Sequence, residues 1–351
     1  MKNIRLYINR ENWPQFVSGV LITLIVVVIF YYGQQANAAQ EQPPVKLIVY
    51  AFSTQEEALS QGILPAFEKF WEADTGKELE IETVIGPSAT LAGQINLGAP
   101  ADVAIFSNAH HLTWLKMGRK VKLDTQPIVI GMTPMVIVTR PGNPYDILSY
   151  ADLAQADLCL LHADPHSSGA GEWAILAEYG SALRDTGSPS EAKAQLQAIW
   201  NNVRLLGTSA RATLVLFELG AGDALITYEQ DARLAQERGV PIEIVIPPQT
   251  IIAQHIAVTV DDNVTLRERP VVQAFMDYLL SESAQRVLGR FHLRPINLTY
   301  KGFPPISNPF TVEDLGGWSH AYSELVEEYW QTEIEPGLDL IPTPMLINSE
   351  D

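Results

Sequence analysis

Three short stretches place small and hydroxyl-bearing residues where a strand-like segment gives way to a helix-like one. They are Gly86-Pro87-Ser88-Ala89-Thr90, Ser167-Ser168-Gly169-Ala170-Gly171 and Gly207-Thr208-Ser209-Ala210-Arg211-Ala212-Thr213. Each offers backbone N–H groups at the positive end of a helix dipole, and glycine lets an anion approach closely. A single junction of this kind is more often only a helix N-cap. Three together predict a site for one small oxyanion, bound by N–H and hydroxyl donors.

Strand-like and helix-like segments alternate at short intervals around these junctions. Strands are expected at 46–52, 78–86, 101–107, 157–165 and 242–249, and helices at 58–76, 88–98, 171–183, 191–203 and 269–291. This alternation predicts an α/β fold whose first half has a mostly parallel sheet. The economical arrangement is two lobes joined by extended crossings near 128–134 and 245–252. Ligands in such folds lie beyond the carboxyl ends of the strands and between the lobes.

Composition and charge restrict the partners of this chain. Its 351 residues suffice for two domains with cores of their own, and its formal charge of −18 argues against nucleic acid as a partner. A bound anion would have to be held by local dipoles against this overall charge. The single cysteine, Cys159, stands among apolar residues of an expected strand, where a buried structural role is more typical than a reactive one.

The N-terminal segment, residues 1–38, has the features of an export signal. Lys2, Arg5 and Arg10 precede an apolar stretch at 16–32, and Ala36-Asn37-Ala38 has the small-x-small form of a cleavage site. The apolar stretch is short for a membrane span, which favours a cleaved signal peptide over an uncleaved anchor. Both alternatives place the protein outside the cytoplasm, in the periplasm or anchored through residues 16–32.

Four stretches resemble the sulfate family of periplasmic solute-binding proteins over residues 46–330. PHSSGAGEWAILAEYGSAL and VRLLGTSARATLVLFELGAGDALITYEQDA resemble the two signatures of this family. GPSATLAGQINLGAPADVAIFS and PFTVEDLGGW resemble two further segments of it. The resemblance implies a two-lobe, type II binding-protein fold that captures a tetrahedral dianion and presents it to the membrane subunits of an ABC transporter.

The resemblance also implies which residues contact the anion. Carried over by position, Ser88, Ser168, Gly169, Ala170 and Ala210 are the donors, and Arg211 supports its loop without touching the ligand. Two positions depart from the family pattern. Tyr228 stands where the family has a Trp that donates an N–H, and Thr54, beside Ser53, stands where it has an Asp. Tyr228 is reminiscent of molybdate-binding relatives and leaves the identity of the anion open.

The choice of anion follows from protonation. Sulfate is fully deprotonated at neutral pH and needs donors only, whereas phosphate carries a proton and needs an acceptor. No acidic residue lies within the three junctions, and Glu172, which flanks one of them, is expected to point to solvent. The junctions therefore favour sulfate, thiosulfate or molybdate over phosphate.

Three other functions have weaker support in the sequence. His162, Asp164 and His166 have a ligand-like spacing, but a turn at a strand end is the more common reason, and His110-His111 is expected in a solvated turn. A hydrolase would need a nucleophile paired with a histidine, and no pairing is evident around Ser168. A membrane-anchored anion sensor would use the same cleft.

The sequence thus predicts a monomeric oxyanion receptor that is not an enzyme and needs neither cofactor nor metal. Its predicted parts are an N-terminal segment 1–38, lobe 1 at 39–128, lobe 2 at 129–247, the return of lobe 1 with the C-terminal helices at 248–330, and a tail at 331–351. The acidic and proline-containing residues from Glu335 onward predict a flexible end.

Overall fold

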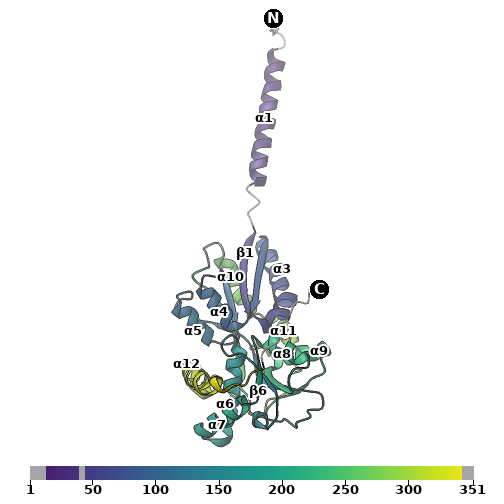
Figure 1. Ribbon diagram of the computed structural model, residues 1–351. Coiled ribbons are helices and arrows are strands. Elements are labelled where there is room, and N and C mark those ends of the chain that lie inside the picture. The colour runs from purple at the N-terminus through teal and green to yellow at the C-terminus, as the bar shows by residue number, and fades with distance from the viewer. Residues whose placement is uncertain (1–12, 39–43, 342–351) are drawn as a thin grey trace, which may run out of the picture. The chain divides into compact units, whose positions relative to one another are not determined.

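The chain divides into two compact units, one ending at Pro44 and the other beginning at Val45. The computed structural model describes residues 13–38 and 44–341. The first unit contains a single described helix, α1 (Trp13–Ala38) (Figure 1). Its described aliphatic side chains are exposed. Within the described ranges, no helix combines the length and the apolarity that crossing a membrane requires. The predicted cleavage after Ala38 stays a prediction.

The second unit is a mixed α/β fold. Its strands are β1 (Val45–Phe52), β2 (Leu79–Gly86), β3 (Val103–Phe106), β4 (Ile128–Thr139), β5 (Leu160–Ala163), β6 (Val203–Gly207), β7 (Ala224–Tyr228), β8 (Glu243–Val245) and β9 (Ile252–Thr259). Its α-helices are α2 (Glu56–Ala58), α3 (Leu64–Thr75), α4 (Ser88–Asn96), α5 (His110–Met117), α6 (Gly169–Thr186), α7 (Pro189–Trp200), α8 (Ala210–Glu218), α9 (Glu229–Glu237), α10 (Arg269–Leu279), α11 (Glu282–Arg290) and α12 (Gly317–Ala321).

The strands form a sheet in the order β2-β1-β3-β9-β4-β7-β5-β6, with β8 paired to β4. Strand β1 is parallel to β2 and β3, as the alternation of elements in the first half predicts. Strand β5 is parallel to β6 and β7. Strand β9 returns from far along the chain and runs antiparallel to β3 and β4, so the sheet is mixed.

The long strand β4 links the two halves of the sheet. Its first residues, 128–134, pair with β9, and residues 135–139 pair with β7. The predicted crossings at 128–134 and 245–252 therefore fall on the start of β4 and just before β9. Their role as hinges, and the predicted lobe boundaries, stay predictions.

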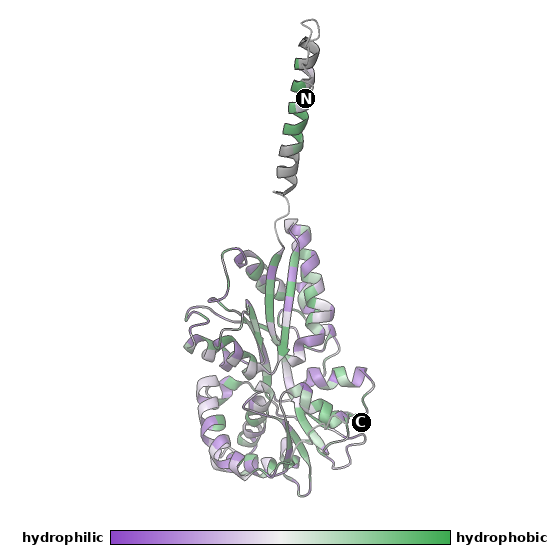
Figure 2. Ribbon diagram, turned by 45° about the horizontal axis from the view of Figure 1, so that its top comes forward, coloured by the Kyte–Doolittle hydropathy of each residue, from purple (hydrophilic) through white to green (hydrophobic). Residues whose placement is uncertain are grey.

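Hydrophobic strands lie inside the unit, and more polar helices surround them (Figure 2). Helix α6 is the exception, because every residue from Gly169 to Ala182 is buried. A helix buried on all sides must satisfy each polar side chain it carries inside the protein. Glu172 and Glu178, both fully buried, are the two carboxylates to which this applies on α6.

The C-terminal segment corrects one expectation. A helical segment, η6 (Tyr322–Ile334), packs against α6, and residues beyond it also bind the body. Glu335 lies 2.7 Å from the ring of His166, and the N–H of Ile341 donates to the carbonyl of Arg204 at 2.8 Å. The expected flexible end is therefore wrong for residues 335–341, and residues 342–351 lie outside the described ranges.

Candidate functional site

Six strands deliver residues to one small cavity from their carboxyl ends. Strand β1 is followed by Ser53 and Thr54, β2 by Pro87 and Ser88, and β3 by Ser107. Strands β5, β6 and β7 lead to the starts of α6, α8 and α9. The cavity has a volume of about 10 Å³ and is lined by Phe52, Ser53, Thr54, Pro87, Ser88, Ser107, Ser168, Gly169, Ala170, Ser209, Ala210 and Tyr228.

The structure brings all eight predicted ligand contacts together around this cavity: Ser53, Thr54, Ser88, Ser168, Gly169, Ala170, Ala210 and Tyr228. Sequence reasoning missed Ser107 and Ser209 as lining residues. Ser209 belongs to the junction at 207–213, but the sequence pattern predicts only that it is part of this loop. Ser107 was placed at the end of an expected strand, and its position at a carboxyl strand end was the signal that could have identified it.

Three helices begin at the cavity: α4 at Ser88, α6 at Gly169 and α8 at Ala210. The first N–H groups of a helix have no acceptor within that helix, and the helix dipole is positive at this end. Ser168 and Ser209 are the N-caps of α6 and α8, where their Oγ atoms accept from the N–H groups of Ala170 and Ala212. The hydroxyl protons of both serines remain available to a ligand.

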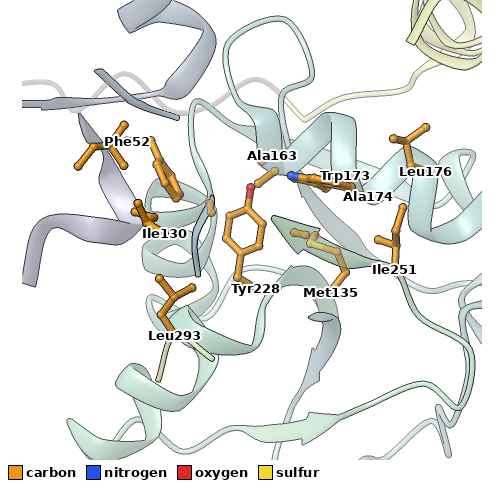
Figure 3. Close-up of a cluster of buried hydrophobic side chains, with 14 of the residues drawn as sticks. Phe52, Ile130, Met135, Ala163, Trp173, Ala174, Leu176, Tyr228, Ile251 and Leu293 are labelled. Carbon is orange, nitrogen blue, oxygen red and sulfur yellow. The ribbon is translucent and has the colours of Figure 1, made fainter. Parts of the chain in front are cut away.

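Three buried hydroxyls have no hydrogen-bond partner in the described structure, and two of them, Tyr228 OH and Ser107 Oγ, line the cavity. Tyr228 is fully buried, and its ring stands between Phe52 on one side and Trp173 and Met135 on the other (Figure 3). Burial raises the pKa of the Tyr228 phenol well above its ordinary value, while the nearby Ser107 side chain, beyond good hydrogen-bond geometry, acts to lower it. The phenol therefore keeps its proton and acts as a donor. An unpaired buried hydroxyl costs free energy, which a ligand in the cavity would recover.

Gly169 keeps the cavity open. A Cβ atom there would lie 1.9 Å from Ser107 Oγ and 2.7 Å from Asn108 Nδ2. The sequence pattern predicted glycine at this junction for the approach of an anion. In the structure the glycine also makes room for the end of β3.

Arg211 does not line the cavity. Its Nη2 atom lies 2.6 Å from Glu57 Oε2 and 3.3 Å from Asp231 Oδ1. The carboxylate of Asp231, fully buried, also accepts a hydrogen bond of 2.7 Å from Thr54 Oγ1. The Thr54 hydroxyl is thus already used, so at this position the backbone N–H is the group left for a ligand. This arrangement fits the supporting role predicted for Arg211, which stays a prediction.

The expectation that Glu172 points to solvent is wrong. Its side chain is fully buried, and Oε2 accepts from Asn108 Nδ2 at 2.5 Å while Oε1 lies 3.2 Å from His111 Nε2. The expected solvated turn at His110-His111 is also wrong, because both residues begin α5 and His111 is fully buried. The first turn of α6 packs against the first turn of α5, and neither segment reveals this by itself.

The pairing of these residues extends to the cavity. His111 Nδ1 lies 3.0 Å from Ser88 Oγ, so Ser88, His111 and Glu172 form a continuous chain of hydrogen-bonding groups. A paired histidine was not evident from the sequence. Among the described residues, no group of histidine, cysteine and carboxylate side chains is arranged to hold a metal ion.

The chain is similar to known proteins over most of its length. Residues 47–294 match the profile of the bacterial extracellular solute-binding protein family. The chain is 28% identical to the sulfate-binding protein of Synechococcus elongatus over 90% of this chain and 93% of that protein. It is 31% identical to the sulfate-binding protein of Escherichia coli over 74% of this chain and 83% of the relative. The solved structure of the sulfate-binding protein SubI of Mycobacterium tuberculosis superposes with a TM-score of 0.72 at 25% identity, covering 80% of this chain and 99% of SubI.

Proposed function

We propose, from the premise that this chain belongs to the bacterial extracellular solute-binding protein family, that it captures a tetrahedral oxyanion. Sulfate is the first candidate, because relatives that cover most of the chain are sulfate-binding proteins. The protein then presents the anion to the membrane subunits of an ABC-type importer. It acts outside the cytoplasm and does no covalent chemistry.

The observation that carries this proposal is the set of donors around the cavity. Two buried hydroxyls without partners and the N-terminal ends of three helices meet there. Peptide dipoles and hydroxyls can offset the charge of a dianion without a fixed counter-ion. Such a site releases its ligand without having to separate a salt bridge.

The lining of the cavity favours a fully deprotonated anion. None of its lining residues in the described structure is an aspartate or a glutamate, so a protonated oxygen would find no carboxylate acceptor. Sulfate and thiosulfate satisfy this condition at neutral pH, as does molybdate. Hydrogenphosphate does not, and we expect it to bind least well.

The chain of Ser88, His111 and Glu172 has the residue types of a hydrolytic triad, but the cavity favours binding over catalysis. The cavity volume is about 10 Å³, far below the ~300–1,000 Å³ typical of pockets for organic ligands. It leaves no room for an organic substrate. Ser88 Oγ also accepts from the N–H of Ser107 at 3.2 Å, which holds it at the cavity wall.

Thermal unfolding of the full-length, ligand-free protein with each anion tests this function. A specific ligand at a hundred times its dissociation constant should add roughly 2.7 kcal/mol to the free energy of unfolding. We expect the increase with sulfate, a smaller one or none with phosphate, and a ranking of thiosulfate and molybdate that defines the preference. No increase with any of the four would contradict the proposal. A larger increase with molybdate than with sulfate would favour the molybdate alternative and implicate Tyr228.

A further inference from the structure

We propose that Glu172 and His111 hold a proton that turns the Ser88 hydroxyl toward the cavity, so that binding of one oxyanion takes up one proton. Both are positioning residues, since neither lines the cavity. The inference rests on the proposed function and adds to it a proton-linked control of affinity.

The hydrogen bonds around Ser88 restrict the directions in which its hydroxyl proton can point. Ser88 Oγ accepts from the N–H of Ser107 at 3.2 Å, which uses one of its two lone pairs. Its second neighbour is His111 Nδ1, at 3.0 Å. A serine hydroxyl has one proton and two lone pairs, so the proton carried or lacked by His111 decides where the Ser88 proton points.

The hydrogen bonds at Glu172, the other end of the chain of hydrogen-bonding groups, are fixed as well. Asn108 Oδ1 accepts from the backbone N–H of His110 at 3.0 Å, so the Asn108 amide must present its NH₂ group to Glu172 Oε2. Glu172 Oε1 is left to face His111 Nε2 at 3.2 Å. The side chains of Glu172 and His111 are both without solvent exposure, so their hydrogen-bond partners are groups of the protein.

Without the extra proton, the pair carries one negative charge. His111 then donates from Nε2 to Glu172, and its bare Nδ1 accepts the Ser88 proton. The hydroxyl proton turns away from the cavity, and the remaining lone pair of Ser88 Oγ is left for the ligand. An anion would meet this lone pair and the nearby charge of Glu172, and both oppose binding.

With one more proton the pair is neutral overall, and His111 Nδ1–H donates to Ser88. Both lone pairs of Ser88 Oγ are then occupied, by His111 and by the N–H of Ser107. The Ser88 proton is free to donate to the anion. A bound dianion favours this state, so it draws one proton from solvent into the pair, with no other bond made or broken.

The other titratable groups around the pair keep one charge state between about pH 5 and 9. Burial lowers the pKa of His110, which precedes His111 on α5, to about 4. Burial raises the pKa of Tyr322, whose ring stacks on His110, and of Tyr228. Burial lowers the pKa of His255, beside Tyr228, to about 3. A change of sulfate affinity in this range therefore does not come from His110, His255, Tyr228 or Tyr322.

The test measures sulfate affinity and proton uptake of the full-length protein from pH 5.5 to 9. Sulfate itself stays a dianion over this range. Above the pH at which the free pair has lost its proton, we expect the dissociation constant to rise about tenfold per pH unit. Calorimetry in buffers of different ionisation enthalpy should show uptake approaching one proton per sulfate, and it requires no variant.

Glu172→Gln is the matching substitution. The glutamine amide can donate to His111 Nε2 while its oxygen accepts from Asn108, which fixes His111 with a proton on Nδ1 at every pH. We expect the pH dependence and the proton uptake to disappear, and this variant to bind sulfate more tightly than the wild type at pH 9. Glu178→Gln is the control. Glu178 lies on the same helix as Glu172, is equally buried and is also paired with a histidine, but it does not line the cavity. It should keep the wild-type slope.

Each outcome is decisive. Sulfate binding with no pH dependence and no proton uptake in the wild type would overturn the inference and leave the proposed function standing. A slope retained in Glu172→Gln would overturn it too. Absence of sulfate and thiosulfate binding at every pH would instead overturn the proposed function.

Discussion

Helix α6 carries two buried carboxylates, six residues apart, and each is paired with a buried histidine. Glu178 lies 2.7 Å from His162 Nε2 and also accepts from Trp200 Nε1 at 2.7 Å. Glu172 lies 3.2 Å from His111 Nε2 and also accepts from Asn108. The two pairs differ in what the second ring nitrogen meets. His162 Nδ1 has no partner in the described structure, whereas His111 Nδ1 reaches Ser88 at the cavity.

This difference separates a structural pair from one that acts on a ligand. Both pairs are fully buried, both consist of a glutamate and a histidine, and both glutamates lie on α6, so none of these properties distinguishes the two pairs. What distinguishes them is the connection of His111 to a hydroxyl that lines the cavity. We expect changes around the Glu178 pair to alter the free energy of unfolding, and changes around the Glu172 pair to alter sulfate affinity and its dependence on pH.

Substitution of two glycines of α6, one at the cavity and one away from it, should give the largest difference in sulfate affinity. In Gly169→Ala the new methyl group would overlap Ser107 Oγ and fill the cavity, and an overpacking cost of ~1–3 kcal/mol corresponds to sulfate affinity lower by about 5- to 150-fold. In Gly180→Ala the methyl group would meet the ring of Phe310 at 2.3 Å, away from the cavity. Titration calorimetry and thermal unfolding of both should show lost affinity in the first variant and lost stability with retained affinity in the second. Equal affinity losses would remove Gly169 from the site.

Two buried tyrosines give the next largest effect. Tyr228 OH has no partner, whereas Tyr150 OH lies 3.0 Å from the Met135 carbonyl and 2.9 Å from Thr250 Oγ1. Tyr228→Phe should leave the ligand-free protein as stable as the wild type and weaken sulfate binding about tenfold or more, since hydrogen bonds to charged groups contribute ~1.5–3 kcal/mol. Tyr150→Phe should lower the free energy of unfolding without changing affinity. A stability loss in Tyr228→Phe alone would show that its hydroxyl is bonded within the protein.

The Glu178 pair itself supplies a third prediction. Glu178→Gln disturbs the hydrogen bonds from His162 and Trp200, and we expect it to lower the free energy of unfolding by ~1–3 kcal/mol. Sulfate affinity should stay within error of the wild type. Chemical denaturation and calorimetry on the same preparation would check both quantities, and a large affinity change would end the contrast between the two pairs.

A smaller effect concerns acid stability. Burial lowers the folded-state pKa of His255 to about 3 and of His110 to about 4, below the value of about 6.5 for an unfolded histidine. Between about pH 6.5 and 4 the unfolded chain binds more protons, so the free energy of unfolding should fall as pH falls. His255→Gln should reduce this loss in unfolding experiments across that range. Sulfate affinity is predicted to change in the opposite direction, so an identical pH profile for both quantities would contradict the account.

The sequence predicted the elements and the junctions better than the contacts between them. The parallel strands β1, β2 and β3 and the starts of α4, α6 and α8 follow from local patterns of apolar residues, glycine and serine. The return of β9 between β3 and β4 is a pairing of distant segments, and no local pattern specifies it. The same is true of Glu172 and His111, which are 61 residues apart. Their isolated side chains suggested solvent exposure, and only the packing of α6 on α5 buries them.

The most direct test of the central claim is to locate the anion. Crystals of the full-length protein grown with selenate, an isostere of sulfate, would show selenium by its anomalous scattering. We predict one strong peak inside the cavity, with anion oxygens within hydrogen-bond distance of Tyr228 OH, Ser107 Oγ and the N–H groups at the starts of α6 and α8. An unoccupied cavity at saturating selenate, or a peak elsewhere on the protein, would contradict the assignment of this site.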